Sequence, residues 1–157
     1  MRDFHNTDTI SFDVLEKILQ YILNYCHTES VSRIGLQMWG GEPLLALDRI
    51  EFVVDFFRHT SLSVTIDIET NASLITDEIA KKLFDWGIHI GVSMDGTPEL
   101  HNRQRRKVSG KPSAEGVERG IRNLQKYYGE DIGGITVVTK HNYKYVKEIL
   151  DYFIYSL

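Results

Sequence analysis

The chain has 157 residues, a length typical of one domain; 42% of them are hydrophobic and 25% are charged. This is the composition of a globular protein, and it excludes a disordered tail, a collagen-like repeat and a disulfide-stapled miniprotein. The net charge of -4 is not that of a general nucleic-acid-binding or anionic-membrane-binding surface. A domain of this size buries roughly 70% of the surface that its unfolded chain exposes, so we expect a sizeable core.

The single cysteine, Cys26, excludes an internal disulfide and a self-contained thiolate metal site. No apolar run reaches the ~20 residues of a membrane-spanning helix. Residues 1–6 are polar and charged, and no secretory apolar region follows them. We therefore expect a cytoplasmic protein without a membrane or nucleic-acid partner.

Helical and strand patterns alternate along the chain. Apolar residues at a spacing of three, four and seven predict helices, and short alternating runs predict strands. Ser11, Thr76 and Ser113 have the position and chemistry of helix N-caps. The expected helices are 10–26, 47–59, 76–86, 113–128 and 143–155, the expected strands are 33–39, 62–68, 88–94 and 133–139, and 97–112 is expected to be a long polar loop.

This alternation predicts an α/β fold, a parallel sheet with crossover helices. Two architectures satisfy it: an open doubly wound sheet and a stretch of a β/α barrel. The pattern starts on a helix with no strand before it. We therefore interpret the chain as an excerpt of a larger domain.

Polar residues follow all four expected strands, whereas the strands themselves are apolar. In parallel α/β folds the functional edge is the carboxyl end of the strands. This concentration predicts one binding face rather than four unrelated turns. The segments are 39–45, 69–72, 93–96 and 139–142.

The first of these segments contains Gly40-Gly41-Glu42-Pro43. Two glycines allow the backbone to approach a ligand closely, and the proline restricts the chain after Glu42. A carboxylate held in this way is suited to an ammonium partner. A plain strand-to-helix turn with a solvated glutamate explains the spacing equally well. A phosphate loop does not, because it needs a following lysine and a serine or threonine.

Four motifs in order carry a resemblance to a known family: W-G-G-E-P-L-L, E-T-N-A-S-L-I, G-V-S-M-D-G-T-P-E-L-H, and an arginine followed by G-K-P-S. Together they resemble the radical S-adenosylmethionine superfamily, in its SPASM-type branch that matures peptides and sulfatases. The resemblance runs from the first helix to Asn142. It implies that residues 1–157 are the central part of a radical SAM domain, a segment of a partial (β/α)6 TIM-like barrel.

The resemblance also implies roles for seven residues as S-adenosylmethionine ligands. Glu42 would take the methionine amino group, Ser93 would contact the ribose, and Arg105, four residues after His101, would bind the methionine carboxylate. Asn71 would lie near the ligand. The full implied set is Gly40, Gly41, Glu42, Asn71, Ser93, Asp95 and Arg105.

The role implied for Arg105 fits the chemistry of arginine, because a guanidinium offers a carboxylate two parallel donors. Arg105 nevertheless lies in the basic run 103–107, and a basic loop is usually solvated. Arg106 remains an alternative to it. The family register selects Arg105.

Two features depart from the family pattern. The second motif usually begins with glutamine, where this chain has Glu69. The C-x-x-x-C-x-x-C loop that holds the family's 4Fe-4S cluster is missing from the 157 residues, and such clusters require thiolates. We expect the cluster ligands to lie outside this chain and Cys26 to pack as a small hydrophobic residue.

The function implied for the full-length parent is reductive cleavage of S-adenosylmethionine to a 5′-deoxyadenosyl radical that modifies a peptide or protein side chain. This chain alone would supply binding and orientation and would be inactive. The alternative is a cluster-free α/β module that binds a nucleoside without redox activity. A receiver-like domain is disfavoured because the acidic pair that it needs after the first strand is missing.

Overall fold

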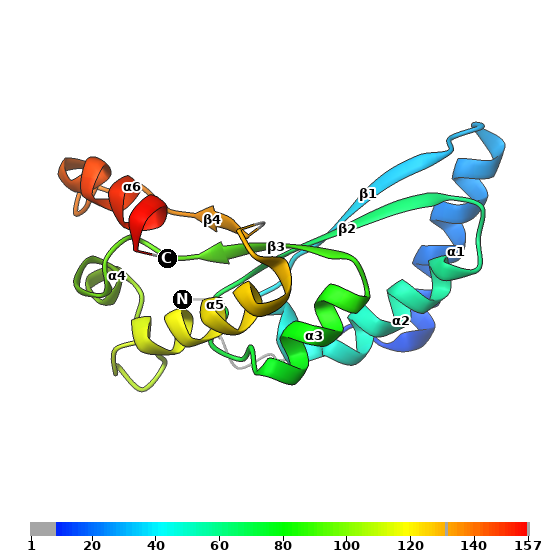
Figure 1. Ribbon diagram of the computed structural model, residues 1–157. Helices are drawn as coiled ribbons and strands as arrows, with labels where there is room; N and C mark the ends of the chain where they lie inside the picture. The colour runs from blue at the N-terminus through cyan, green and yellow to red at the C-terminus, as the bar shows by residue number, and fades with distance from the viewer. Residues whose placement is uncertain (1–8, 131, 157) are drawn as a thin grey trace.

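The computed structural model describes residues 9–130 and 132–156, which form a parallel sheet with its connecting helices (Figure 1). Residues 1–8, on which the expectation about a secretory leader rests, lie outside this part. The sheet order is β1-β2-β3-β4, and every neighbouring pair is parallel. This confirms the predicted α/β class. The strands are β1 (Arg33–Met38), β2 (Ser63–Thr70), β3 (Ile88–Ser93) and β4 (Gly133–Ile135).

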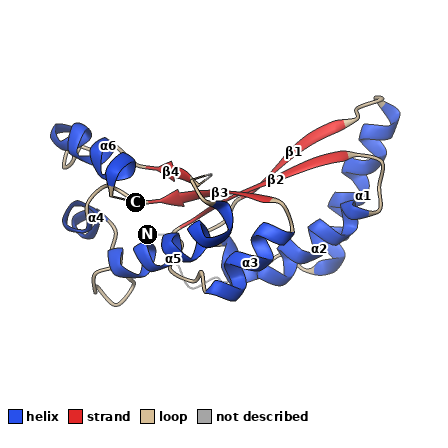
Figure 2. Cartoon of the chain, viewed as in Figure 1, coloured by secondary structure: helices blue, strands red, loops and turns tan. Residues whose placement is uncertain are grey.

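The helices connect the strands nearly where the sequence predicts them (Figure 2). The hydroxyl of Ser11 accepts from the Val14 N–H, and the hydroxyl of Thr76 accepts from the Ile79 N–H, so these two predicted caps are confirmed. The predicted cap at Ser113 is wrong, because its hydroxyl makes no capping bond and is engaged by other partners. The elements are α1 (Phe12–Thr28), η1 (Pro43–Ala46), α2 (Leu47–Arg58), α3 (Asp77–Asp85), α4 (Pro98–Gln104), α5 (Ala114–Tyr128), η2 (Tyr143–Tyr145) and α6 (Val146–Tyr155).

Four of these helices, α1, α2, α3 and α5, lie on the same side of the sheet (Figure 1). The strand residues facing them are apolar and buried, among them Ile66, Ile68, Ile90 and Val92. A doubly wound sheet has helices on both faces, whereas a β/α barrel has them only on the outside. Sequential strand order with helices on one side therefore identifies the sheet as an arc of a barrel.

The opposite face of the sheet is polar. Gln37, Asp67 and His89 lie side by side on β1, β2 and β3, and Glu69 follows two residues after Asp67. Gln37 Nε2 donates to Glu69 Oε1 at 3.2 Å, and His89 Nδ1 lies 3.3 Å from Asp67 Oδ1. The His89 side chain is 67% exposed on this face.

The predicted loop 97–112 contains a helix, α4. The hydroxyl of Thr97 accepts from the Leu100 N–H at 3.5 Å, and Pro98 occupies the first turn, where its missing N–H costs nothing. Only Leu100 and His101 of this helix are buried. A helix with so short an apolar stripe gives almost no periodic signal, which is why the sequence pattern missed it.

The last strand is shorter than the predicted 133–139. β4 ends at Ile135, although its carbonyl still accepts from the Met94 N–H at 3.0 Å. The next donor in line, the N–H of Val137, binds a carboxylate oxygen of Asp95 instead of the sheet. A side chain thus ends the strand pairing.

Cys26 is buried with a free thiol at the end of α1, as expected for a small hydrophobic residue. Within the described residues, no helix is both long and apolar enough to span a membrane.

Gly120 of α5 lies where the helix crosses the segment after β2. A Cβ atom there would lie 2.0 Å from the Ala72 carbonyl oxygen, a backbone atom that cannot simply rotate away. We expect Gly120→Ala to lower the free energy of unfolding by roughly 1–3 kcal/mol in a urea titration. Its gain in helix propensity, about 1 kcal/mol at most, does not offset the clash.

Gly116, one turn earlier in α5, is the matched control. A Cβ there would meet Ser73 Cβ at 3.5 Å, an ordinary van der Waals contact. Gly116→Ala should be neutral or stabilising. Equal losses at both positions would contradict the proposed clash.

Candidate functional site

A polar pocket of about 280 Å³ lies at the carboxyl ends of β1, β2 and β3. Parallel pairing brings these ends to one edge of the sheet, so the segments that follow the strands meet there. The pocket is lined by Trp39, Gly40, Gly41, Glu42, Glu69, Thr70, Asn71, Ser93 and Arg105.

Glu42 joins the loop after β1 to the end of β2. Its Oε1 accepts from the Thr70 hydroxyl at 2.6 Å and from the Leu44 N–H at 3.2 Å, and its Oε2 accepts from the Asn71 N–H at 3.0 Å. Pro43 follows directly and opens η1. A carboxylate held by three donors keeps one orientation at the pocket wall, with acceptor capacity remaining for a ligand.

Arg105 supplies the opposite charge. It ends α4, and its Nε donates to Asp95 Oδ2 at 2.7 Å. Asp95 is buried, with its side chain only 2% exposed, whereas that of Arg105 is 30% exposed. The pocket is therefore lined by both a carboxylate, Glu42, and a guanidinium, Arg105.

Asp95 is saturated with donors. Its Oδ1 accepts from the Val137 N–H at 3.0 Å and from the Thr136 hydroxyl at 3.2 Å, in addition to the Arg105 bond on Oδ2. Burial raises the pKa of Asp95, but the hydrogen bonds from Arg105 and Val137 outweigh it, so the pKa lies below its ordinary value. Asp95 is therefore a charged group behind the pocket wall.

The other basic residues of the loop point elsewhere. Arg103 pairs with Glu99 on α4, and Arg106 Nη1 donates to the Gly110 carbonyl within its own loop. Lys107 is exposed. Of the basic run 103–107, Arg105 is the residue that lines the pocket.

His101 is buried beneath Arg105. Its Nδ1 accepts from the Asp95 N–H at 3.2 Å, and its Nε2 lies 3.0 Å from Ser113 Oγ. Ser113 donates its single hydroxyl proton to the Arg105 carbonyl at 2.7 Å, so it must accept from His101. This assigns a neutral imidazole with its proton on Nε2. Desolvation lowers the pKa of His101, which agrees with the neutral form.

Six of the seven residues implied by the sequence line one pocket: Gly40, Gly41, Glu42, Asn71, Ser93 and Arg105. The seventh, Asp95, lies behind Arg105 rather than in the wall.

Five contributors to the site were not predicted from the sequence. One is Glu69, which lines the pocket although it departs from the family's usual glutamine. Trp39, 75% exposed at the rim, and Thr70, 2% exposed beside Glu42, both lie within predicted motifs, so their position was the available signal. In the sequence, His101 served only to locate Arg105 four residues later, and Ser113 was predicted only as a helix cap. Nothing in the spacing shows that they bond to each other.

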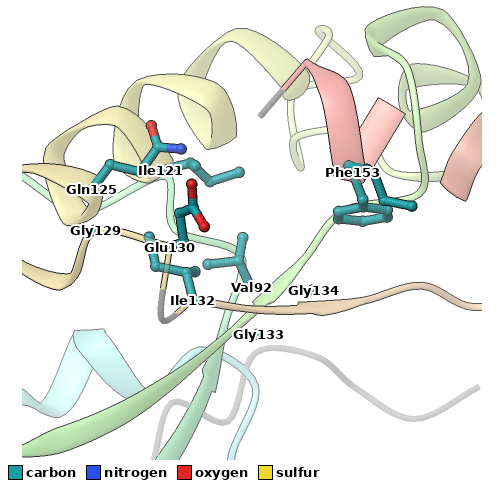
Figure 3. A pocket seen from close by; sticks show the side chains of 10 residues that line it. Val92, Ile121, Gln125, Gly129, Glu130, Ile132, Gly133, Gly134 and Phe153 are labelled. Carbon is teal, nitrogen blue, oxygen red and sulfur yellow. The ribbon is translucent and has the colours of Figure 1, made fainter. Parts of the chain in front are cut away.

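A second cavity, of about 340 Å³, opens beside the start of β4, between α5 and α6 (Figure 3). Ile121 of α5 faces it, and Phe153 of α6 lies across from Ile121. Its wall combines apolar side chains, among them Val92 and Ile132, with the polar side chains of Gln125 and Glu130. It lacks the opposed charges of the strand-end pocket, which we therefore take as the functional site.

Among the described residues, no group of three or more His, Cys, Asp and Glu side chains is arranged to hold a metal ion.

Comparison with known proteins agrees with the resemblance found in the sequence motifs. The family model described as Radical SAM superfamily matches residues 3–153. The chain is 34% identical over 151 residues to an uncharacterized protein of Methanocaldococcus jannaschii, a match that covers 95% of this chain and 50% of that protein. It is 32% identical over 145 residues to the cysteine-type anaerobic sulfatase-maturating enzyme of Clostridium perfringens, covering 90% and 38%.

Solved structures agree with the sequence matches. The structure described as native anSMEcpe with bound AdoMet and Kp18Cys peptide superimposes with a TM-score of 0.85 at 29% identity, over 94% of this chain and 41% of that one. The chain thus spans half or less of the length of these relatives.

The buried neutral His101 predicts a pH-dependent stability. Because its pKa in the folded chain is lowered, the unfolded chain takes up the proton first as the pH falls below about 6.5. The stability contribution is therefore complete above that pH and is lost as the pH falls toward the folded-state pKa. The free energy of unfolding, measured by urea titration from about pH 7.5 to about pH 5, should show this.

His101→Gln removes the titration but not the polarity. The difference in unfolding free energy between the wild-type chain and this variant should shrink as the pH falls. The other histidines cancel in this difference. A difference that stays constant with pH would contradict a buried neutral His101.

Proposed function

The chain belongs to the Radical SAM superfamily, and we propose that its strand-end pocket binds the amino-acid part of S-adenosylmethionine. One observation supports this more than any other: Glu42 and Arg105, which come from different motifs, line the same pocket with opposite charges. A zwitterionic amino acid needs one carboxylate for its ammonium and one guanidinium for its carboxylate. Glu42 would take the ammonium, and Arg105 would take the carboxylate.

The remaining pocket residues would complete the site. Gly40 and Gly41 have open space where a Cβ would lie, so their backbone can be approached closely. Ser93, at the end of β3, would donate to the ribose, and Asn71 would lie beside the ligand. The Asn71 side chain already accepts from the Ser73 N–H at 2.9 Å, which fixes its orientation. Asp95 would act behind these residues, through Arg105.

The cluster of this superfamily does not fit the residues of this chain. A cubane held by thiolates needs several cysteines, and the chain has only Cys26, which is buried at the far end of α1. We propose that its ligands lie outside these 157 residues, which are then the central part of a larger radical SAM domain. A cluster held by ligands elsewhere in the protein would supply the electron for reductive cleavage of the sulfonium. The residues of this chain would bind and orient that substrate.

For the whole protein we propose an oxidoreductase that modifies a peptide or protein side chain. The support is the similarity to sulfatase-maturating enzymes and to a structure that holds both AdoMet and a peptide. The polar face of the sheet, opposite α1, α2, α3 and α5, adjoins the pocket and would leave room for a second substrate. A reducing compartment such as the cytoplasm suits this chemistry and the free thiol of Cys26.

The first test concerns Glu42, in the whole cluster-loaded protein. Glu42→Gln keeps an oxygen for its backbone donors but removes the charge that would face the ammonium. A hydrogen bond to a charged group contributes roughly 1.5–3 kcal/mol, so the affinity for S-adenosylmethionine should fall roughly tenfold to a hundredfold in calorimetry. Reductive cleavage of the bound ligand would distinguish an enzyme from a cluster-free binding module.

Asp67→Asn is the matched control for this test. It removes a carboxylate from the neighbouring polar face of the sheet, outside the pocket wall. Its affinity for S-adenosylmethionine should match the wild type. If Glu42→Gln binds as tightly as the wild type while its circular dichroism is native, Glu42 does not belong to the site.

The second test concerns the register of the basic loop. Arg105→Lys should weaken S-adenosylmethionine binding, because lysine lacks the planar two-donor fork. Arg103→Ala and Lys107→Ala should be nearly silent, because solvated charges contribute little. A loss at Arg106→Ala with none at Arg105→Lys would shift the register by one residue. Small uniform losses would indicate only a diffuse positive patch.

A further inference from the structure

Arg105 is held through both its side chain and its main chain. Its Nε donates to Asp95 Oδ2 at 2.7 Å, and its carbonyl oxygen accepts from Ser113 Oγ at 2.7 Å. Within the described part of the chain, its two terminal nitrogens make no hydrogen bond, and the residue lines the strand-end pocket. The guanidinium is thus fixed at its inner end, while its outer donors remain available.

The Ser113 hydroxyl does not cap the helix that Ser113 begins. It occupies the N-cap position of α5, yet its hydroxyl makes no capping bond. Asn102 of α4 performs the capping instead, because its Oδ1 accepts from the N–H groups of Ser113 and Ala114 at 2.8 and 3.0 Å. The freed hydroxyl donates to Arg105 and accepts from His101. A serine at the N-cap position usually caps the helix itself, so capping alone does not explain this arrangement.

Asp95 connects three separate segments. One oxygen binds Arg105, and the other holds Thr136 and Val137 in the chain after β4. Its own N–H donates to His101. The path from Asp95 through His101 and Ser113 to the Arg105 carbonyl, and back through Nε to Asp95, forms a closed ring of hydrogen bonds. The side chain and the main chain of Arg105 are therefore both linked by hydrogen bonds to Asp95, just after the end of β3.

We propose that Asp95, His101 and Ser113 are positioning residues that hold the terminal nitrogens of Arg105 toward the ligand carboxylate. The inference rests on the proposed function, because it assumes that Arg105 binds that carboxylate. A two-donor contact requires the guanidinium plane to be set before the ligand arrives, or ordering the long side chain reduces the affinity. The ring supplies this preorganisation.

Removing the Asp95 charge has two opposed effects. It increases the net positive charge at Arg105, which favours an anionic group, and it removes the anchor on Nε. An asparagine side chain at this position would offer a single oxygen in place of two, and its amide hydrogens would face either the Arg105 Nε–H or the Val137 N–H. Arg105 is partly exposed, so solvent screens the charge effect. Loss of orientation therefore dominates.

The experiment compares two ligands in the whole protein. S-adenosylmethionine carries the amino-acid part, and 5′-methylthioadenosine lacks it. Dissociation constants for both are measured by calorimetry for Asp95→Asn, Ser113→Ala, Ser113→Thr and Arg105→Ala, and for the double variant Asp95→Asn/Arg105→Ala. Thr136→Val is the control, because it removes one donor from the other oxygen of Asp95 and leaves the Arg105 bond intact.

We expect Asp95→Asn and Ser113→Ala to weaken S-adenosylmethionine binding about tenfold, the lower end of what orienting partners contribute elsewhere. Affinity for 5′-methylthioadenosine should not change. Ser113→Thr restores the hydroxyl and should restore affinity, and Thr136→Val should match the wild type. In the Arg105→Ala background, Asp95→Asn should add nothing.

Other outcomes overturn the proposal in distinguishable ways. Equal weakening of both ligands by Asp95→Asn and Ser113→Ala would make the ring merely structural. If Arg105→Ala weakens binding while both of these variants bind normally, Arg105 needs no positioning and the proposed function stands. If Arg105→Ala binds S-adenosylmethionine normally, Arg105 does not bind the ligand carboxylate and that part of the proposed function is wrong. Should Asp95→Asn fail to fold, the Ser113 pair decides alone, because Ser113 is only partly buried.

Discussion

Parallel pairing of four consecutive strands is the constraint on which the rest of this structure depends. A parallel strand can be followed only by a crossover, so every loop after a strand returns to the same edge of the sheet. Because the order is β1-β2-β3-β4, each crossover steps in the same direction, and right-handed crossovers then place successive helices on one face. The polar segments after β1, β2 and β3 consequently meet in one pocket, and the opposite face of the sheet stays free of those helices.

That free face explains the unusual chemistry of the strands. In a sheet covered on both sides, Asp67 and Glu69 would be buried charges and would need costly compensation. Here they lie on an open polar surface, with Gln37 and His89 as neighbours. The same strand carries Ile66 and Ile68 toward the helices, where both are buried. One strand thus faces the apolar core on one side and the polar surface on the other.

The two carboxylates of the site have different environments and different roles. Glu42 is half-buried at the pocket wall and can still accept from a ligand, whereas Asp95 is buried and its oxygens are occupied by protein donors. A buried charge is tolerated only when it is paired and hydrogen-bonded, so the cost of placing Asp95 there is met by Arg105 and the N–H of Val137. The pairing links the stability of the β4 edge to the orientation of the arginine.

The sequence by itself determined the alternating α/β order and two helix caps, because periodicity and cap chemistry are local properties of the chain. Six of the residues that line the pocket were implied by the resemblance of its four motifs to the radical SAM superfamily. Tertiary structure decided the rest. Whether the sheet is covered on one face or two depends on the direction of the crossovers, which no local pattern encodes. The end of β4 depends on competition between the sheet and Asp95 for the Val137 N–H, and α4 forms around Leu100 and His101 although its sequence is polar. The ring through His101 and Ser113 closes between residues 12 positions apart, and only the packing of α4 against α5 brings them together.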